Sequence, residues 1–133
     1  MKIFRTKYKV LNFWLDTAVI FLVMFAAAYM FFWPARVDGN SMAPTLQHGD
    51  QVITSRFLAN FGTLNVGDIV LVQVEDRTVI KRIADILDDG TYFVLGDNLL
   101  TSVDSRHFGP VENRHILAKI IFKYFPFTEI NFY

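Results

Sequence analysis

The feature that most constrains the fold of this chain is an almost wholly apolar stretch over residues 10–33. At about 1.5 Å per helical residue, it is long enough to cross a hydrocarbon core of about 30 Å. Asp16, its one charged residue, lies about a turn from the polar start and can reach the headgroups. Aromatic side chains crowd the other end, as they do at membrane interfaces: Tyr29, Phe31, Phe32 and Trp33. The stretch predicts a transmembrane helix over 10–33 that Pro34 closes.

Charge is distributed unevenly on the two sides of this stretch. The formal net charge is zero, yet residues 1–9 carry four basic residues and no acid. Because basic residues stay on the cytoplasmic side, we expect a cytoplasmic tail over 1–9 and an extracytoplasmic body over 34–133. The body has more acidic than basic residues, which argues against the basic face of a nucleic-acid-binding protein. A cleaved signal peptide, cut after the alanines at 26–28, and a buried core helix are the alternative interpretations of the apolar stretch.

After residue 50 the sequence changes to short β-branched runs separated by turn residues, a pattern typical of strands. About 100 residues follow the span, which is enough for one small core. The chain has no cysteine, so it can form neither a disulfide nor a thiolate metal site. Residues 57–66 are expected to be an irregular loop. The expected strands are 51–54, 69–74, 78–84, 91–95 and 115–124, with the second and third paired as a hairpin.

A turn containing a serine lies between the apolar stretch and the first expected strand. Gly39 gives the backbone the freedom for a sharp turn, while Pro44 fixes its own φ and favours an extended Ala43. Ser41 is therefore expected on a stiff corner that exposes its hydroxyl and aims backbone N–H groups at one point. Acyl transfer needs both. Taken alone, the stretch is more often a plain turn with a solvated serine.

Lys81 lies inside an apolar expected strand. Because side chains alternate along a strand, Lys81 shares a face with Val79 and Ile83. Burial disfavours the charged amine and lowers its pKa, and a neutral amine can take the proton of a serine hydroxyl. The alternative is a lysine on an edge strand that reaches out to water.

Residues 96–109 form a third stretch, rich in glycine and small polar residues. Asp104 and Arg106 are two positions apart and are expected to form an ion pair that fixes this loop. The hydroxyls of Ser102 and Ser105 could orient a neighbouring amine. Taken alone, the stretch is equally well a solvated polar loop.

Together, the three stretches resemble bacterial type I signal peptidases, in particular the compact Gram-positive members. The nucleophile motif of that family, Ser-Met-x-Pro-Thr-Leu, is found at 41–46, and its Lys-Arg motif at 81–82. Its Gly-Asp-Asn motif is found at 96–98, and Ser-x-Asp-Ser-Arg-x-aromatic-Gly at 102–109. The resemblance implies a mainly β fold, with one transmembrane helix followed by a small antiparallel catalytic sheet. It also implies a membrane-bound serine endopeptidase that removes signal peptides from exported precursors.

By this resemblance, Ser41 attacks the scissile carbonyl and Lys81 acts as general base, with no metal or cofactor. The resemblance also implies that Ser102 orients the amine and that Asp104 and Arg106 brace the loop. The backbone N–H of Ser41 would help to form the oxyanion hole. Some relatives carry a second donor, a hydroxyl residue two positions before the nucleophile, where this chain has a glycine.

Substrate choice follows from the same resemblance. A precursor would bind as an added strand and be cut after a small-x-small sequence of the Ala-x-Ala type. The small side chains would enter shallow apolar pockets, for which the expected lining residues are Val37, Met42, Leu46 and Ile80. The implied partners are exported preproteins and membrane lipid, near the secretion translocon and without nucleic acid. We expect a single-pass monomer in the cell membrane.

Two other functions are compatible with parts of this pattern. A repressor-type autoprotease also uses a Ser–Lys pair, but it would need a DNA-binding region in place of the span. A membrane-anchored, non-catalytic module that assists assembly of surface proteins is the main alternative. The presence of both Ser41 and Lys81 weighs against it.

Overall fold

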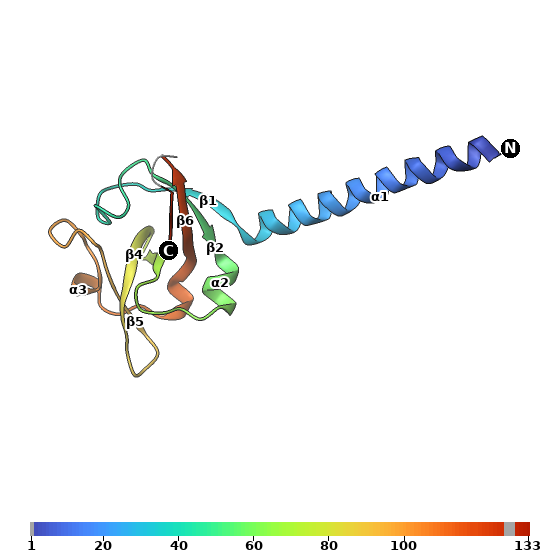
Figure 1. Cartoon of the computed structure of the whole chain (residues 1–133). Coiled ribbons are helices and arrows are strands. Elements are labelled where there is room, and N and C mark those ends of the chain that lie inside the picture. Colours follow the sequence, from blue (N-terminus) through green and yellow to red (C-terminus); the bar gives the residue numbers. More distant parts are fainter. Residues whose placement is uncertain (1, 127–129) are drawn as a thin grey trace. The chain divides into compact units, whose positions relative to one another are not determined.

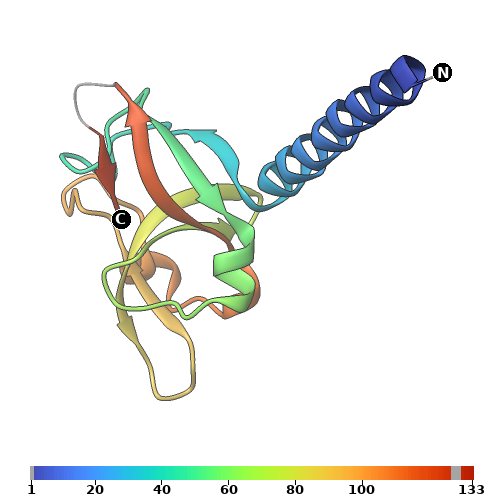
Figure 2. The same cartoon turned by 45° about the vertical axis from the view of Figure 1, so that its right-hand side comes forward.

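A computed structural model of the chain describes residues 2–126 and 130–133. It divides into two compact units, Met1–Phe31 and Phe32–Tyr133. Figures 1 and 2 show the first unit as the helix α1 and the second as a β domain.

Helix α1 runs from Lys2 to Phe31, so it starts inside the predicted 1–9 tail, of which Met1 lies outside the described residues. Its apolar part, Leu11–Tyr29, is long enough to span a membrane, and none of it is buried. This exposure contradicts the alternative interpretation of the stretch as a buried core helix. The helix ends earlier than predicted, and Trp33 and Pro34 instead begin strand β1, Trp33–Arg36. Proline is compatible with such an edge strand because no ladder bond needs its missing N–H.

The second unit is an antiparallel sheet in the order β1-β2-β6-β3-β4-β5, with β7 also paired to β6. All five expected strands are present, and the predicted hairpin is the β3–β4 pair. Figure 2 shows β2 and β6 side by side, as their pairing requires. The bounds of the strands after β1 are β2 Gln51–Ser55, β3 Ile69–Val74, β4 Arg77–Ile86, β5 Tyr92–Leu95, β6 Ile116–Phe125 and β7 Asn131–Phe132.

Three short helical segments interrupt the sheet connections. Helix α2, Arg56–Phe61, lies where a loop was expected, and it starts because the Ser55 hydroxyl accepts the Leu58 N–H at 3.3 Å. Helix α3, Ser105–Phe108, falls in the third motif stretch, and a 3₁₀ turn, Asn113–His115, precedes β6.

Two apolar clusters cover the two faces of the central hairpin. In β3, Ile69 belongs to one cluster with Leu71 packed against it, whereas Val70 and Val72 belong to the other. The alternation follows from the strand period of two. We name the clusters after these strand residues, as the Ile69 cluster and the Val70 cluster. Lys81 pairs with Val70 across the hairpin and therefore lies on the face of the Val70 cluster.

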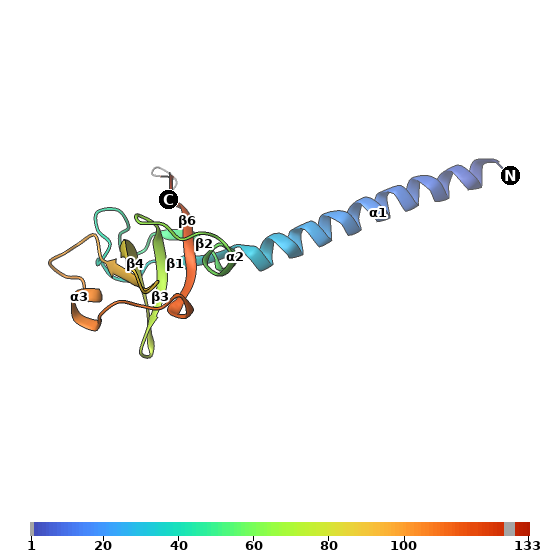
Figure 3. The same ribbon diagram turned by 90° about the horizontal axis from the view of Figure 1, so that it is seen from below.

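Strand β4 is only half covered on its outer side. Residues 82–86 pair with β5, whereas 77–81 pair only with β3 among the described residues. The turn between β3 and β4 projects from the sheet in the view of Figure 3. The first half of β4 therefore offers an open edge next to Lys81.

Candidate active site

The loop between β1 and β2 presents Ser41. Gly39, two residues before the serine, has a φ of 86°, a left-handed conformation that glycine adopts without strain. Met42 and Leu46 are 1% and 0% exposed, and their burial in the Ile69 cluster fixes the loop to the core. Ser41, one residue before this anchor, stays half-buried. Among the described residues, no hydrogen bond occupies the Ser41 backbone N–H.

Strand β4 brings Lys81 to this serine. The Lys81 Nζ donates to Ser41 Oγ at 2.9 Å and to the Ile80 carbonyl at 3.0 Å. Lys81 is only 2% exposed. Burial lowers the pKa of its amine below the usual lysine value, although the Asp104 carboxylate acts in the opposite direction. The structure thus joins two residues that are 40 positions apart in the sequence.

The third stretch is organised around Asp104, which is 0% exposed. Its carboxylate accepts bonds from Arg106 Nε at 2.8 Å, from Arg106 Nη2 at 2.9 Å and from the Gly96 N–H at 3.1 Å. Burial opposes ionisation of Asp104, but the bonds from Arg106 and Gly96 outweigh it and hold the pKa below its ordinary value. The expected Asp104–Arg106 pair is therefore present, and Asp104 also caps α3.

Ser102 lies near the dyad but is not bonded to it. Its Oγ is buried and makes no hydrogen bond of ordinary geometry among the described residues, although it lies close enough to the Asp104 carboxylate to help lower the pKa of that group. The two described hydrogen bonds of the Lys81 amine go to Ser41 and Ile80, so no described hydrogen bond joins Ser102 to Lys81. Gly96 packs against this site: a Cβ there would lie 2.1 Å from Ser102 Oγ and 2.5 Å from the Ser41 carbonyl oxygen.

Two further contacts hold the motif stretches together, and the sequence did not predict them. Arg82 Nε and Nη2 bond both carboxylate oxygens of Asp97, at 2.8 and 2.7 Å, which ties the residue after Lys81 to the Gly-Asp-Asn motif. The Asn98 N–H donates to the Ser41 carbonyl at 3.0 Å. The only sequence signal for either contact is that each partner belongs to a motif, since spacing does not reveal which motifs touch.

A hollow of about 230 Å³ opens beside Ser41, and we call it the Ser41 pocket. Ile80, one of the expected lining residues, does line it. The other three, Val37, Met42 and Leu46, are buried in the Ile69 cluster beneath it and are not among its lining residues. The remaining walls come from β1, the following loop, β3 and β4: Ala35, Arg36, Asp38, Leu71, Thr78 and Val79.

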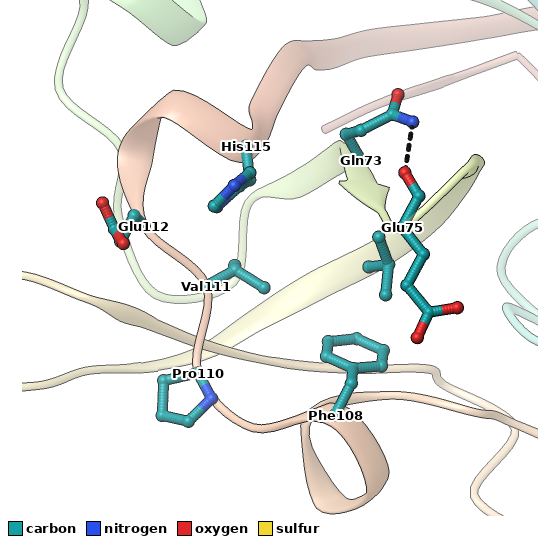
Figure 4. Close-up of a pocket in the computed structure, with 8 residues that line it drawn as sticks. Gln73, Glu75, Phe108, Pro110, Val111, Glu112 and His115 are labelled. Atoms are coloured by element: carbon teal, nitrogen blue, oxygen red, sulfur yellow. Dashed lines mark hydrogen bonds between the residues drawn. The ribbon is translucent and has the colours of Figure 1, made fainter.

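A larger hollow of about 480 Å³ lies away from the dyad. Figure 4 shows Glu112 and His115 on one side of it and Phe108 and Glu75 on the other. The carbonyl of Glu75 accepts a bond from Gln73 Nε2 at 2.9 Å. None of the residues that line this larger hollow is a serine or a lysine. Within residues 2–126 and 130–133, no three His, Asp or Glu side chains gather as a metal-binding group.

The sequence of this chain matches those of known proteins. The family model described as "Signal peptidase, peptidase S26" matches residues 10–86 and 84–125, which include Ser41, Lys81 and the third stretch. Mitochondrial ATP-independent inner membrane protease subunit 1a of Arabidopsis thaliana is 34% identical, over 68% of each chain. Signal peptidase I V of Bacillus subtilis (strain 168) is 28% identical, over 82% of this chain and 96% of the relative. Signal peptidase IB of Staphylococcus aureus (strain MRSA252) is 23% identical, over 95% of each. The chain belongs to the peptidase S26 family of signal peptidases.

Proposed function

We propose that this protein is a membrane-bound serine endopeptidase that removes signal peptides from exported precursors, with Ser41 as nucleophile and Lys81 as general base. The observation that carries the proposal is the 2.9 Å contact between Lys81 Nζ and Ser41 Oγ, made by a lysine that is almost fully buried. Burial keeps a larger share of this amine neutral, which is the form that can accept a proton.

The proposed reaction runs through an acyl-enzyme. The neutral amine of Lys81 takes the proton of Ser41 while the serine oxygen attacks the scissile carbonyl, and the Ser41 N–H stabilises the resulting oxyanion. The Lys81 ammonium then gives its proton to the departing amine of the mature protein, and the peptide C–N bond breaks. Lys81, neutral again, activates a water that hydrolyses the ester and frees the signal peptide. Asp104 and Arg106 act by holding the loop that packs against the dyad.

The precursor is proposed to bind as an extended strand along the open edge of β4, residues 77–81. Its small side chains, at the first and third positions before the cut, enter the Ser41 pocket against Ile80 and Thr78. Val37, Met42 and Leu46 support this pocket from below, because Ala35, Leu71 and Ile80 pack against their cluster. The small volume of the pocket favours cleavage after Ala-x-Ala sequences.

Helix α1 is proposed to anchor the protein in the cell membrane, with residues 1–9 in the cytoplasm and 34–133 outside. The support is its exposed apolar stretch and the basic residues that precede it. We expect a monomer close to the secretion translocon. Protease added to intact protoplasts should digest the domain, and digestion that required lysis would contradict this topology.

The decisive experiment is cleavage of a precursor with an Ala-x-Ala site by the full chain in detergent. Wild type should cut at that site, while folded Ser41→Ala and Lys81→Ala should not. Thr63→Ala, an exposed hydroxyl residue outside the Ser41 pocket, is the control and should keep full activity. Phenylalanine at the first position before the cut should nearly abolish processing, since it exceeds the space of the pocket.

The second candidate is a membrane-anchored, non-catalytic module that assists assembly of surface proteins. The described contact between Ser41 and Lys81 weighs against it, since an inert module has no need of a buried amine bonded to a serine. A folded wild-type protein that cleaves no Ala-x-Ala precursor would favour this module.

A further inference from the structure

A third hollow, of about 420 Å³, adjoins the Ser41 pocket. We call it the Phe108 pocket, and Val79 lines both hollows. Its apolar walls are Val74, Val79, Val103 and Phe108, and its polar walls are Glu75, Arg77 and His107. It is therefore nearly twice as large as the Ser41 pocket and reaches from the start of β4 to α3.

The two hollows open on opposite faces of the β3–β4 hairpin. Leu71 pairs with Ile80 across the hairpin, and both line the Ser41 pocket. Val74 pairs with Arg77, and both line the Phe108 pocket. Cross-strand partners point to the same face, and neighbours along a strand point to opposite faces. The open edge of β4 therefore separates a small pocket on one face from a large pocket on the other.

A substrate strand along this edge must place side chains in both directions. If its first and third residues before the cut point into the Ser41 pocket, its second and fourth residues point to the opposite face. The Ser41 pocket extends from Ile80 towards Thr78, so the residues before the cut run towards Arg77. The scissile carbonyl lies at Lys81, and the fourth residue therefore comes beside Arg77 and Val79.

We propose that the Phe108 pocket is a specificity site for the fourth residue before the cut and that it favours a large apolar side chain there. This inference rests on the proposed function and adds a second selection to it. The walls suit such a side chain because Val74, Val79 and Phe108 pack against the Val70 cluster and form a firm apolar floor. Val103 is 63% exposed and completes the pocket from the loop side.

The test is a series of Ala-x-Ala peptides that differ only at the fourth position, cut by the full chain in detergent. Phenylalanine there should give a kcat/KM roughly tenfold above alanine, the discrimination typical of an apolar pocket. In Val103→Asp this preference should disappear, and lysine at the fourth position should become the favoured residue. Leu100→Asp is the matched control: Leu100 is 97% exposed, in the same loop, and does not line the Phe108 pocket. It should keep the wild-type order.

Three results would overturn the inference while leaving the proposed peptidase intact. One is equal cleavage of the whole series by wild type, and another is faster cleavage of the alanine peptide than of the phenylalanine peptide. The third is an unchanged preference in a folded Val103→Asp, as judged by its thermal unfolding. No cleavage of any peptide would instead refute the peptidase function itself, and the inference with it.

Discussion

Replacing Gly96 by alanine adds one methyl group at the point where the third motif stretch meets the loop that carries Ser41. The new Cβ would lie 2.1 Å from Ser102 Oγ, 2.5 Å from Ser102 Cβ and 2.5 Å from the Ser41 carbonyl oxygen. The φ of Gly96 lies outside the left-handed region, so its backbone conformation is open to alanine. What excludes the methyl group is lack of space.

The size of the effect follows from these distances. They fall about 1 Å short of the 3.4 Å at which ordinary contact begins, and a misplacement of about 1 Å in a catalytic group costs on the order of 10²-fold in rate. The Ser41 carbonyl cannot retreat freely, because it accepts the Asn98 N–H at 3.0 Å. We expect Gly96→Ala to lower kcat about 100-fold, since the strain moves Ser41 relative to Lys81. Its unfolding free energy should fall by about 1–3 kcal/mol through overpacking.

The assay is single-turnover cleavage of an Ala-x-Ala peptide, with urea unfolding measured on the same samples. Gly90→Ala is the matched control: its φ is 81°, and nothing lies within 4 Å of an added Cβ. That variant should lose some stability through backbone strain and keep its kcat. A folded Gly96→Ala that cleaves at close to the wild-type rate would show that Gly96 does not hold Ser41 in place.

Two further predictions concern ionisable groups. Because burial lowers the pKa of Lys81, the cleavage rate should rise with pH through that lowered pKa. Folded Lys81→Arg should be inactive at every pH, because the guanidinium stays charged. The control is Lys119→Arg, which replaces a lysine that forms an ion pair with Asp68, and it should be active. Cleavage by Lys81→Arg would mean that another group activates Ser41. The pKa of Asp104 is lower in the folded protein than the value of about 3.9 in the unfolded chain, so ionised Asp104 stabilises the fold above that pH. This stabilisation is lost as the pH falls from there through the lowered pKa. The unfolding free energy of Asp104→Asn, measured by urea titration, should therefore be about 2 kcal/mol lower than that of wild type at neutral pH. It should also fall less steeply than that of wild type as the pH is lowered. An equally steep fall would assign the acid sensitivity to other carboxylates.

The parts of the fold that the sequence predicted are those that local chemistry dictates. β-branched runs mark β2 to β6, and a lysine between apolar neighbours marks a buried amine. Sequence-based prediction was wrong where a contact between distant parts of the chain determines the local structure. Helix α2 depends on the Ser55 cap and on burial of Ala59, and neither gives a periodic apolar signal over six residues. The sequence predicts Pro34 as a helix stop, but it lies in an edge strand, three residues beyond the actual end of α1.

The candidate site shows the same division. Ser41 and Lys81 could be predicted as a pair because three motifs occur together in order, whereas pocket walls depend on which way each side chain turns. Met42 and Leu46 are apolar neighbours of the serine, and the loop buries them as its anchor. Leu71 and Thr78 enter the Ser41 pocket through the register of the β3–β4 hairpin, which sequence spacing alone does not give.

The order of the strands also decides when Ser41 and Lys81 can meet. Strand β6 is the last long strand to be synthesised, yet it lies between β2, which follows the Ser41 loop, and β3, which pairs with the strand of Lys81. Until residues 116–125 have emerged, the serine and the lysine belong to two separate hairpins with no strand to join them. We therefore expect a chain whose β6 has not yet paired to hold the two residues apart and to lack the proposed activity.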